Sequence, residues 1–338
     1  MAKKIGNSSY VLKNPPSFLS TAAIVGEVES EGPLGQYFDL SVDEYWDEDS
    51  WEKAETKMFE MSIRKALEKI KLQPQDMDVM LGGDLLNQII SASFAARQLE
   101  IPYLGLYGAC STMTESLIIG SSLIDGEFID RAACVTGSHF STAERQYRTP
   151  NELGNQTPPT SQRTVTGAGA SIIGSGGTGP FITSFTIGKV VDYGIKDAAN
   201  MGAAMAPSAV DTIEIHLNDT GRVPSYYDMI ITGDLGKLGS EILVEKLKEK
   251  DIDISHNHND CGLMVFDIEN QKVDCGGSGC GCAAVTLNAF LIRKMLEGKI
   301  NRILLVATGA LLSTTSSLQG ESIPGVAHAV CIERSLSV

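Results

Sequence analysis

GACSTMTESLIIGSSLIDGEFIDRAACVTG, residues 108–137, has a counterpart later in the chain, CGCAAVTLNAFLIRKMLEGKINRILLVATG, residues 280–309. At this offset of 172 positions (108 to 280), Cys110 aligns with Cys282, and both segments end in Thr-Gly. Each segment has the pattern of a helix followed by an apolar strand. One such match could arise by chance between two ordinary helix–strand units.

A second pair of similar segments makes chance the weaker explanation. DVMLGGDL at 78–85 matches DMIITGDL at 228–235, and this places Asp84 opposite Asp234. Both matches occur in the same order along the chain, each with a glycine-containing strand after it. The sequence therefore predicts an internal duplication.

The predicted elements alternate between strands and helices, which is typical of an α/β protein with layered sheets and helices. We expect two pseudo-equivalent α/β halves, 1–190 and 191–338. In such a duplicated fold, the turn at Cys110 and the turn at 278–282 can face each other across the pseudo-twofold axis. Strands are expected at 21–28, 78–81, 103–107, 132–136, 165–174, 181–191, 227–232, 262–267, 303–308 and 325–333, and helices at 51–70, 85–99, 111–123, 198–217, 238–249 and 282–296.

Composition excludes several classes of protein. The 338 residues carry a net charge of −15, which argues against a nucleic-acid partner because non-specific binding to phosphates needs a basic surface. No apolar segment is long enough to span a bilayer, and the N-terminus lacks the apolar core of a signal peptide. We therefore expect an intracellular protein. Seven cysteines without paired zinc spacings predict neither a disulfide framework nor a metal site.

Cys110 is the first candidate for a functional residue. The apolar run 103–107 leads into a small-residue turn, and the segment 111–123 that follows is helical in pattern. A thiol at the start of a helix can be stabilised as thiolate by the helix dipole. The alternative is a buried structural cysteine, and the local sequence does not separate the two.

The whole-chain pattern resembles the thiolase and β-ketoacyl synthase III superfamily. The resemblance rests on the internal repeat, Ala109-Cys110, Gly137-Ser138 and the segment GAGA at 167–170. It implies a thiolase-like fold in which Cys110 matches the acylated nucleophile of the condensing enzymes. It also implies that a helper histidine would stand at Gly233 or Asp234, and an asparagine or second histidine near Gly277 and Ser278, with a glycine run at 308–311.

This chain has neither histidine nor asparagine at those positions, and its 308–311 segment contains one glycine, Gly309. Condensation needs donors that stabilise the enolate and the oxyanion, and the loss of one such donor costs on the order of 10²–10³ in rate. We therefore expect a cavity without the chemistry, with no catalytic residue and no cofactor. The alternatives are a β-ketoacyl synthase III-like acyltransferase that uses Cys110 and a structural dimer subunit with a vestigial cavity.

The full-length pattern, which includes GGSGCGCAAVTL at 276–287, resembles sporulation proteins of this superfamily. That resemblance implies a ligand, dipicolinic acid (pyridine-2,6-dicarboxylic acid), free or as its calcium chelate, that is moved during sporulation and spore germination. It implies as partners the membrane proteins of the same sporulation channel system, and a peripheral position on the spore inner membrane. Members of the superfamily are commonly homodimers, which the residues themselves do not establish.

The expected ligand-binding residues come from the two turns and the strand ends around them. Three of them have simpler alternatives: core packing for Cys110, a surface or satisfied role for His139 as a lone histidine, and a structural role at a helix start for Asp234, like Asp84. The candidates are Cys110, Met113, His139, Asp234, Ser278, Cys280 and Gly309.

Three further groups have simpler interpretations. HNHND at 256–260 could offer metal or carboxylate ligands, but its composition favours a polar turn. The stretch 140–163 has the pattern of an excursion from the core, and it contains Arg145, Arg148 and Arg163. These side chains could bind a dicarboxylate, but exposure to solvent is the simpler interpretation. The glycine-rich 276–281 could donate backbone N–H groups to an anion.

Overall fold

The computed structural model describes residues 3–147 and 157–336. Its main sheet path contains two five-stranded runs of corresponding order. The runs are joined where β10 meets β3 through the single pair Phe181↔Ser17. The first run consists of β3 (Ser17–Gly26), β9 (Gly167–Gly174), β7 (Arg131–Ser138), β5 (Val79–Gly83) and β6 (Tyr103–Gly105). The second consists of β10 (Phe181–Ile187), β15 (Gly325–Glu333), β14 (Arg302–Ala310), β11 (Met229–Thr232) and β12 (His258–Asp260).

The predicted duplication corresponds to this strand order. The segment 78–85 contains β5 and 228–235 contains β11, and each is flanked by the strand that follows the repeated helix, β7 or β14. β10 falls before the expected boundary at 190, yet it pairs with β15 of the second run along most of its length. By pairing, the second half therefore begins at about β10.

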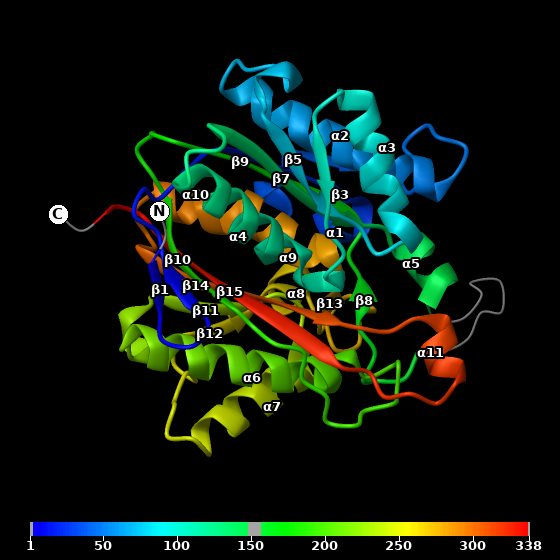
Figure 1. Ribbon diagram of the computed structural model, residues 1–338. Coiled ribbons are helices and arrows are strands. Elements are labelled where there is room, and N and C mark those ends of the chain that lie inside the picture. The colour runs from blue at the N-terminus through cyan, green and yellow to red at the C-terminus, as the bar shows by residue number, and fades with distance from the viewer. Residues whose placement is uncertain (1–2, 148–156, 337–338) are drawn as a thin grey trace.

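Helices and sheets form five layers (Figure 1). Outer helices cover each of the two strand runs, and a central helical layer lies between the runs. Strand alternation explains the layering, because Ala22 and Ile24 of β3 pack with the outer helices whereas Ala23 and Val25 pack with the central ones. The outer helices are α2 (Trp51–Lys69), α3 (Ile90–Leu99), α6 (Met201–Thr220) and α7 (Gly236–Lys248), and the central ones are α4 (Thr112–Asp125), α9 (Cys280–Thr286) and α10 (Ile292–Leu296), the last two linked by a π-helical turn, Leu287–Leu291.

The remaining elements are short. They are the strands β1 (Lys3–Ile5), β2 (Ser9–Val11), β4 (Leu40–Val42), β8 (Arg163–Thr164) and β13 (Gly277–Ser278), and the helices α1 (Glu27–Ser30), α5 (Phe140–Tyr147), α8 (Cys261–Val265) and α11 (Thr314–Leu318). Within the described ranges, no helix combines the length and the apolar character that crossing a membrane requires.

Two predicted elements in the second half are wrong. The expected strand at 262–267 is the helix α8, because the Asp260 side chain accepts from the Gly262 N–H and begins a helix there. The expected polar turn at 256–260 contains the strand β12, whose His258 lies in parallel register with Ile230 of β11. An edge strand of polar residues does not show the apolar pattern on which the prediction depended.

The predicted excursion after His139 is also partly wrong. Its first part is the helix α5, in which the side chains from Ser141 to Glu144 are buried. Thr142 donates to the Glu55 carboxylate of α2 at 2.9 Å, and Ser141 donates to Glu44. These contacts with distant residues hold α5 against the first half, where it forms part of a cavity wall.

Candidate ligand-binding site

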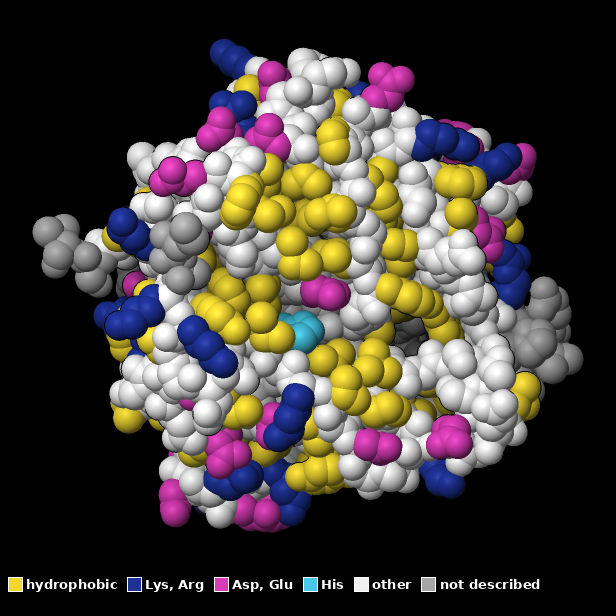
Figure 2. All heavy atoms as spheres, viewed as in Figure 1, with side chains coloured by type: hydrophobic (Ala, Val, Ile, Leu, Met, Phe, Trp, Pro, Cys, Tyr) yellow, Lys and Arg dark blue, Asp and Glu magenta, His cyan; other side chains and the backbone are white. Residues whose placement is uncertain are grey.

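A cavity of about 430 Å³ lies where the two halves meet. It is next to Cys110, in the short turn Ala109–Ser111 that leads into α4. Figure 2 shows a hollow bordered by hydrophobic side chains on this face of the molecule, in the region where Figure 1 places α5, α11 and β8. Its walls come from both halves and are formed by Leu85, Asn87, Tyr107, Ala109, Cys110, Ala143, Tyr147, Thr164, Met201, Ser278, Ala310, Leu311, Leu312, Ser313 and Ser316.

The turn that presents Cys110 is tightly constrained. Ala109 has a φ of 51°, in the left-handed region that residues other than glycine rarely adopt. Its carbonyl oxygen accepts from the Thr112 hydroxyl at 2.6 Å. A Cβ at Gly309 would lie 2.4 Å from the Gly108 carbonyl oxygen, so only glycine lets β14 approach the turn this closely. Gly309 therefore supports the site from behind rather than lining it.

The second turn meets the first, as the predicted pseudo-symmetry requires. Cys280 donates from its thiol to the Ala109 carbonyl oxygen at 3.1 Å, and Ser278 lines the cavity beside Cys110. Gly279 has a φ of 99°, and a Cβ there would lie 2.8 Å from the Ser138 hydroxyl oxygen. The expectation that the turns at Cys110 and 278–282 share one cavity is confirmed by these contacts.

Asp234 lies in the protein interior next to this cavity. One carboxylate oxygen accepts from the Thr308 hydroxyl at 2.8 Å, and the other accepts from the Gly279 N–H at 3.0 Å and the Ser278 hydroxyl at 3.2 Å. Burial raises the pKa of Asp234 to about 6, because desolvation outweighs these hydrogen bonds.

The electrostatics of the turn favour a neutral thiol at Cys110. The residue is 8% exposed, and burial, followed by the nearby Asp234 and Cys280, raises the pKa of Cys110 well above its ordinary value. The short helical turn before α4 does not outweigh these effects. Because Cys110 stands before a helix, the sequence left a thiolate open as one alternative. That ionised form is not the favoured one.

His139 does not reach the cavity. Its side chain is fully buried, its Nε2 lies 2.9 Å from the Glu44 carbonyl oxygen, and its Nδ1 accepts from the Ser141 N–H at 3.2 Å. Both ring nitrogens thus have partners, and burial lowers the pKa of His139, which favours the neutral ring. This histidine is a satisfied interior residue.

Met113 is likewise in the core rather than at the cavity wall. It is fully buried in α4, and its sulfur lies 3.6 Å from the Thr136 hydroxyl oxygen. Of the seven expected residues, Cys110 and Ser278 line the cavity, whereas Asp234, Cys280 and Gly309 pack directly around these turns. Met113 and His139 are not among its lining residues.

The sequence did not predict most of the residues that line the cavity, including Tyr107 and Tyr147. The hydroxyl oxygens of Tyr107 and Tyr147 lie 3.0 Å apart, and both hydroxyls donate to the Leu85 carbonyl oxygen. Burial raises the pKa of Tyr147, so its hydroxyl is a donor at any physiological pH. Ala143 and Tyr147 are four residues apart on α5, and this helical spacing is a signal that could have identified them.

Each lining residue among those described is uncharged. Arg145 pairs with Glu52 and lies over the Trp51 ring, and Arg163 lies 4.0 Å from the Phe140 ring centroid, so neither forms the cavity wall. Arg148 lies outside the described residues. An anionic ligand here would therefore depend on hydroxyl and amide donors.

The described residues also contain no group of three or more histidine, cysteine or acidic side chains that could hold a metal ion. All seven cysteines are buried free thiols. The HNHND segment places Asp260 on backbone N–H groups of Leu235 and Gly236, and His258 beside Thr232. Its polar side chains therefore organise the strand end.

The fold defines the class of protein. A 3-oxoacyl-[acyl-carrier-protein] synthase III from Aquifex aeolicus matches with a TM-score of 0.58 at 15% identity, covering 94% of this chain and 99% of that one. Cerulenin-bound OleA from Xanthomonas campestris matches with a TM-score of 0.62 at 14% identity, over 95% of this chain and 100% of that one. The protein is therefore an α/β protein of the thiolase-like, β-ketoacyl synthase III-like fold.

Sequence comparison is more specific. Residues 6–333 match the model of the stage V sporulation protein AD (SpoVAD) family, and the chain belongs to that family. It is 45% identical over 334 residues to the stage V sporulation protein AD of Bacillus subtilis (strain 168), covering 98% of each chain. The protein is thus a sporulation protein with a thiolase-like fold.

Proposed function

We propose that this protein binds dipicolinic acid, free or as its calcium chelate, without catalysing a reaction, and acts in the movement of that ligand during sporulation and germination. Family membership supports the sporulation role, and the cavity supports the binding role. The observation that carries the non-catalytic part is the environment of Cys110: its thiol is buried, and the described residues that line the cavity with it include no histidine.

The cavity suits a small aromatic acid. Its volume of about 430 Å³ falls within the range typical of small-molecule sites. Leu311, Leu312 and Met201 offer apolar surface to a flat ring. Side-chain groups that could donate to carboxylate oxygens lie on the same wall, on Asn87 and Thr164, whereas the hydroxyls of Tyr107, Tyr147 and Ser278 would first have to leave their acceptors in the protein.

Titration calorimetry with dipicolinate and with its calcium chelate tests the ligand assignment. We expect saturable binding of one ligand per chain, and weaker binding of benzene-1,3-dicarboxylate, which lacks the ring nitrogen. Ala143→Trp fills the cavity and should abolish binding, whereas Phe128→Trp changes a 77% exposed residue beyond the other end of α4 and should not. Absence of heat and of a thermal shift with either form of dipicolinate would refute the assignment.

The second candidate is a β-ketoacyl synthase III-like acyltransferase, favoured only by the position of Cys110 at the cavity wall. Incubation with acyl-CoA followed by mass spectrometry separates the two functions. The binding proposal expects no adduct on Cys110 and no release of free CoA. A stable adduct with turnover would overturn the non-catalytic assignment and leave the ligand assignment open to calorimetry.

We also propose that the protein works with the membrane proteins of its sporulation channel system, peripherally at the spore inner membrane. Family membership is the support for this placement. Fractionation of spores, with and without those membrane proteins, tests it. Loss of the protein from the membrane fraction only when they are absent is the expected result, and recovery solely in the soluble fraction would contradict it.

We also propose that the protein forms a homodimer, paired along the edge strand β6. This strand ends the first run of the sheet, β5 is its one partner among the described strands, and Leu104 within it is 51% exposed. An exposed edge strand can pair with a second copy of itself. Sedimentation should give twice the chain mass, and Leu104→Lys should lower it to one chain.

A further inference from the structure

We infer that Tyr107 and Tyr147 recognise the acid group of the ligand, and that Gln146, outside the cavity, allows their hydroxyls to turn toward it. The inference rests on the proposal that the cavity binds a small acid, and it names the residues that select the acid. In this role the two tyrosines touch the ligand, whereas Gln146 is a positioning residue that acts through the Leu85 carbonyl oxygen.

Three donors converge on one acceptor in the cavity wall. The Leu85 carbonyl oxygen accepts from the Tyr107 hydroxyl at 3.3 Å, from the Gln146 side-chain amide at 3.1 Å and from the Tyr147 hydroxyl. The two hydroxyl oxygens also lie 3.0 Å from each other. A carbonyl oxygen has two lone pairs, so it does not accept well from three donors at once. At least one of these donors can therefore turn to another acceptor while the Leu85 oxygen stays bonded.

Gln146 is the donor that remains on the Leu85 oxygen. Its own side-chain oxygen accepts from the Asn87 N–H at 3.2 Å, and this second bond fixes the amide. Gln146 is not among the described residues that line the cavity, and it lines instead a separate hollow of about 300 Å³ with Thr142 and Arg145. Because the amide stays in place, a ligand can take both tyrosine hydroxyls without leaving an unpaired acceptor in the wall.

A pair of phenol hydroxyls suits an ionised acid. Burial raises the pKa of Tyr147, so its hydroxyl keeps its hydrogen at physiological pH. Two hydroxyls 3.0 Å apart can both donate to one carboxylate, and a hydrogen bond to an ionised acceptor is about twice as strong as one to a neutral acceptor. The pair therefore distinguishes an acid from the corresponding amide, although each described lining residue is uncharged.

The other polar groups of the described wall are less suited to this role. The Ser278 hydroxyl donates to the Asp234 carboxylate at 3.2 Å, and the negative charge of that carboxylate disfavours an acid beside it. The remaining side chains offer single donor groups or bond to one another, and they are Asn87, Thr164, Ser313 and Ser316. Only the tyrosines bring two hydroxyls to one point of the described wall.

Calorimetry with three probes tests the inference: dipicolinate, picolinate, which has one carboxylate, and pyridine-2,6-dicarboxamide, which has the same ring without an acid. We expect the acids to bind at least about tenfold more tightly than the diamide. Tyr107→Phe and Tyr147→Phe should each lower the affinity for the acids about three- to tenfold, and the double variant about ten- to hundredfold. The diamide should lose less, so that the acid-to-amide ratio falls. Tyr193→Phe, at a 69% exposed position, should leave the ratio unchanged.

Gln146→Leu separates a positioning role from a structural one. In the unmodified protein it should weaken acid binding about threefold or more, because a tyrosine hydroxyl must then stay on the Leu85 oxygen. In the variant that lacks both tyrosine hydroxyls, the same change should not alter the affinity further. Gln36→Leu changes an exposed glutamine and is the matched control. A loss of equal size in both backgrounds would overturn the role of Gln146.

Thermal unfolding shows which variants keep the fold, and if the tyrosine variants do not, the unmodified protein still decides. Affinity for both acids no higher than for the diamide would overturn the inference, as would folded tyrosine variants with an unchanged acid-to-amide ratio. If picolinate binds with the expected dependence on the tyrosines while dipicolinate does not bind, the proposed ligand is wrong and this inference stands. If dipicolinate binds all variants equally, the inference is wrong and the proposed ligand stands.

Discussion

Cys280 donates its thiol hydrogen to the backbone oxygen of Ala109 at 3.1 Å, although the two residues are 171 positions apart. This contact joins the first turn of one half to the corresponding region of the other. The cavity wall beside it consists of Cys110 and Ser278. The cavity is therefore a product of the duplication, because its described walls come from both halves.

Gly309→Ala should destabilise the protein and displace the Cys110 turn. The added Cβ would lie 2.4 Å from the Gly108 carbonyl oxygen, so the backbone must shift. We expect a loss of about 1–3 kcal/mol in the free energy of unfolding, measured in denaturant, together with weaker ligand binding. Gly126→Ala is the control, because its φ of −78° suits alanine and its close neighbour is the exposed Phe128 ring. Equal stability of the two variants would contradict this account of Gly309.

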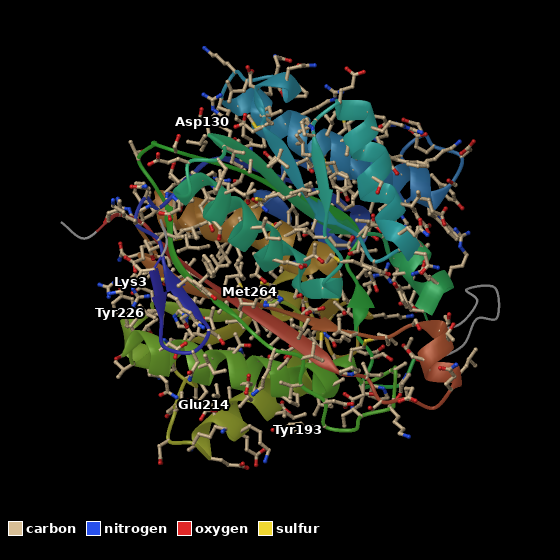
Figure 3. The ribbon with its side chains drawn as sticks, in the orientation of Figure 1. Lys3, Asp130, Tyr193, Glu214, Tyr226 and Met264 are labelled. Atoms are coloured by element: carbon tan, nitrogen blue, oxygen red, sulfur yellow. The ribbon has the colours of Figure 1, made fainter. Side chains whose placement is uncertain are left out.

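Tyr147→Phe should weaken ligand binding about three- to tenfold with little change in melting temperature. The variant removes a hydroxyl that now donates to the Leu85 carbonyl oxygen and that a bound carboxylate could accept from instead, and a hydrogen bond contributes about 0.5–1.5 kcal/mol. Calorimetry measures the affinity. Tyr193→Phe is the matched control, since Tyr193 is 69% exposed and lies at the lower edge of the molecule in Figure 3. If both variants bind alike, the Tyr147 hydroxyl does not contact the ligand.

The affinity for dipicolinate should fall as pH rises through about 6. Asp234 is neutral below this pKa and ionised above it, and its charge then repels an anion in a cavity whose described wall has no cation. Calorimetry between pH 5.5 and 8 should show a loss of about tenfold that is absent in Asp234→Asn. Titration of the ligand itself is common to both proteins and cancels in the comparison. Parallel pH profiles would exclude Asp234 as the cause.

Glu29→Gln should make the protein more stable than the unmodified protein at pH 8, with a smaller difference at pH 5. Glu29 is fully buried against the Thr166 N–H, and burial raises its pKa from 4.5 to about 7. The protonated side chain therefore contributes stability that is complete below pH 4.5 and is lost as pH rises to 7. Removing the titration should recover on the order of 2–3 kcal/mol at pH 8. Urea unfolding of both proteins at pH 5 and pH 8 measures this free-energy difference. The same pH dependence in the variant and the unmodified protein would contradict the role of Glu29.

Local patterns predicted most of the fold. Apolar runs and helical spacings identified the repeated strands and helices, because these signals depend on neighbours a few residues away. The same reasoning failed at β12 and α8, where Asp260 ends one element and begins the next. There a side chain that bonds to the N–H groups of a neighbouring segment outweighs local propensity.

The sequence alone determined the duplicated α/β architecture and the meeting of the Cys110 turn with Ser278 and Cys280. Two similar segments that recur in the same order predict two similar halves, whose corresponding turns can face each other across a pseudo-twofold axis. Only the tertiary structure decided the wall formed by α5 and the neutral state of Cys110. Tyr147 lines the cavity because α5 is fastened to Glu44 and Glu55, far away in the chain. The pKa of the Cys110 thiol is raised first by its own burial and then by the nearby Asp234, and both effects depend on distances in space that sequence separation does not reveal.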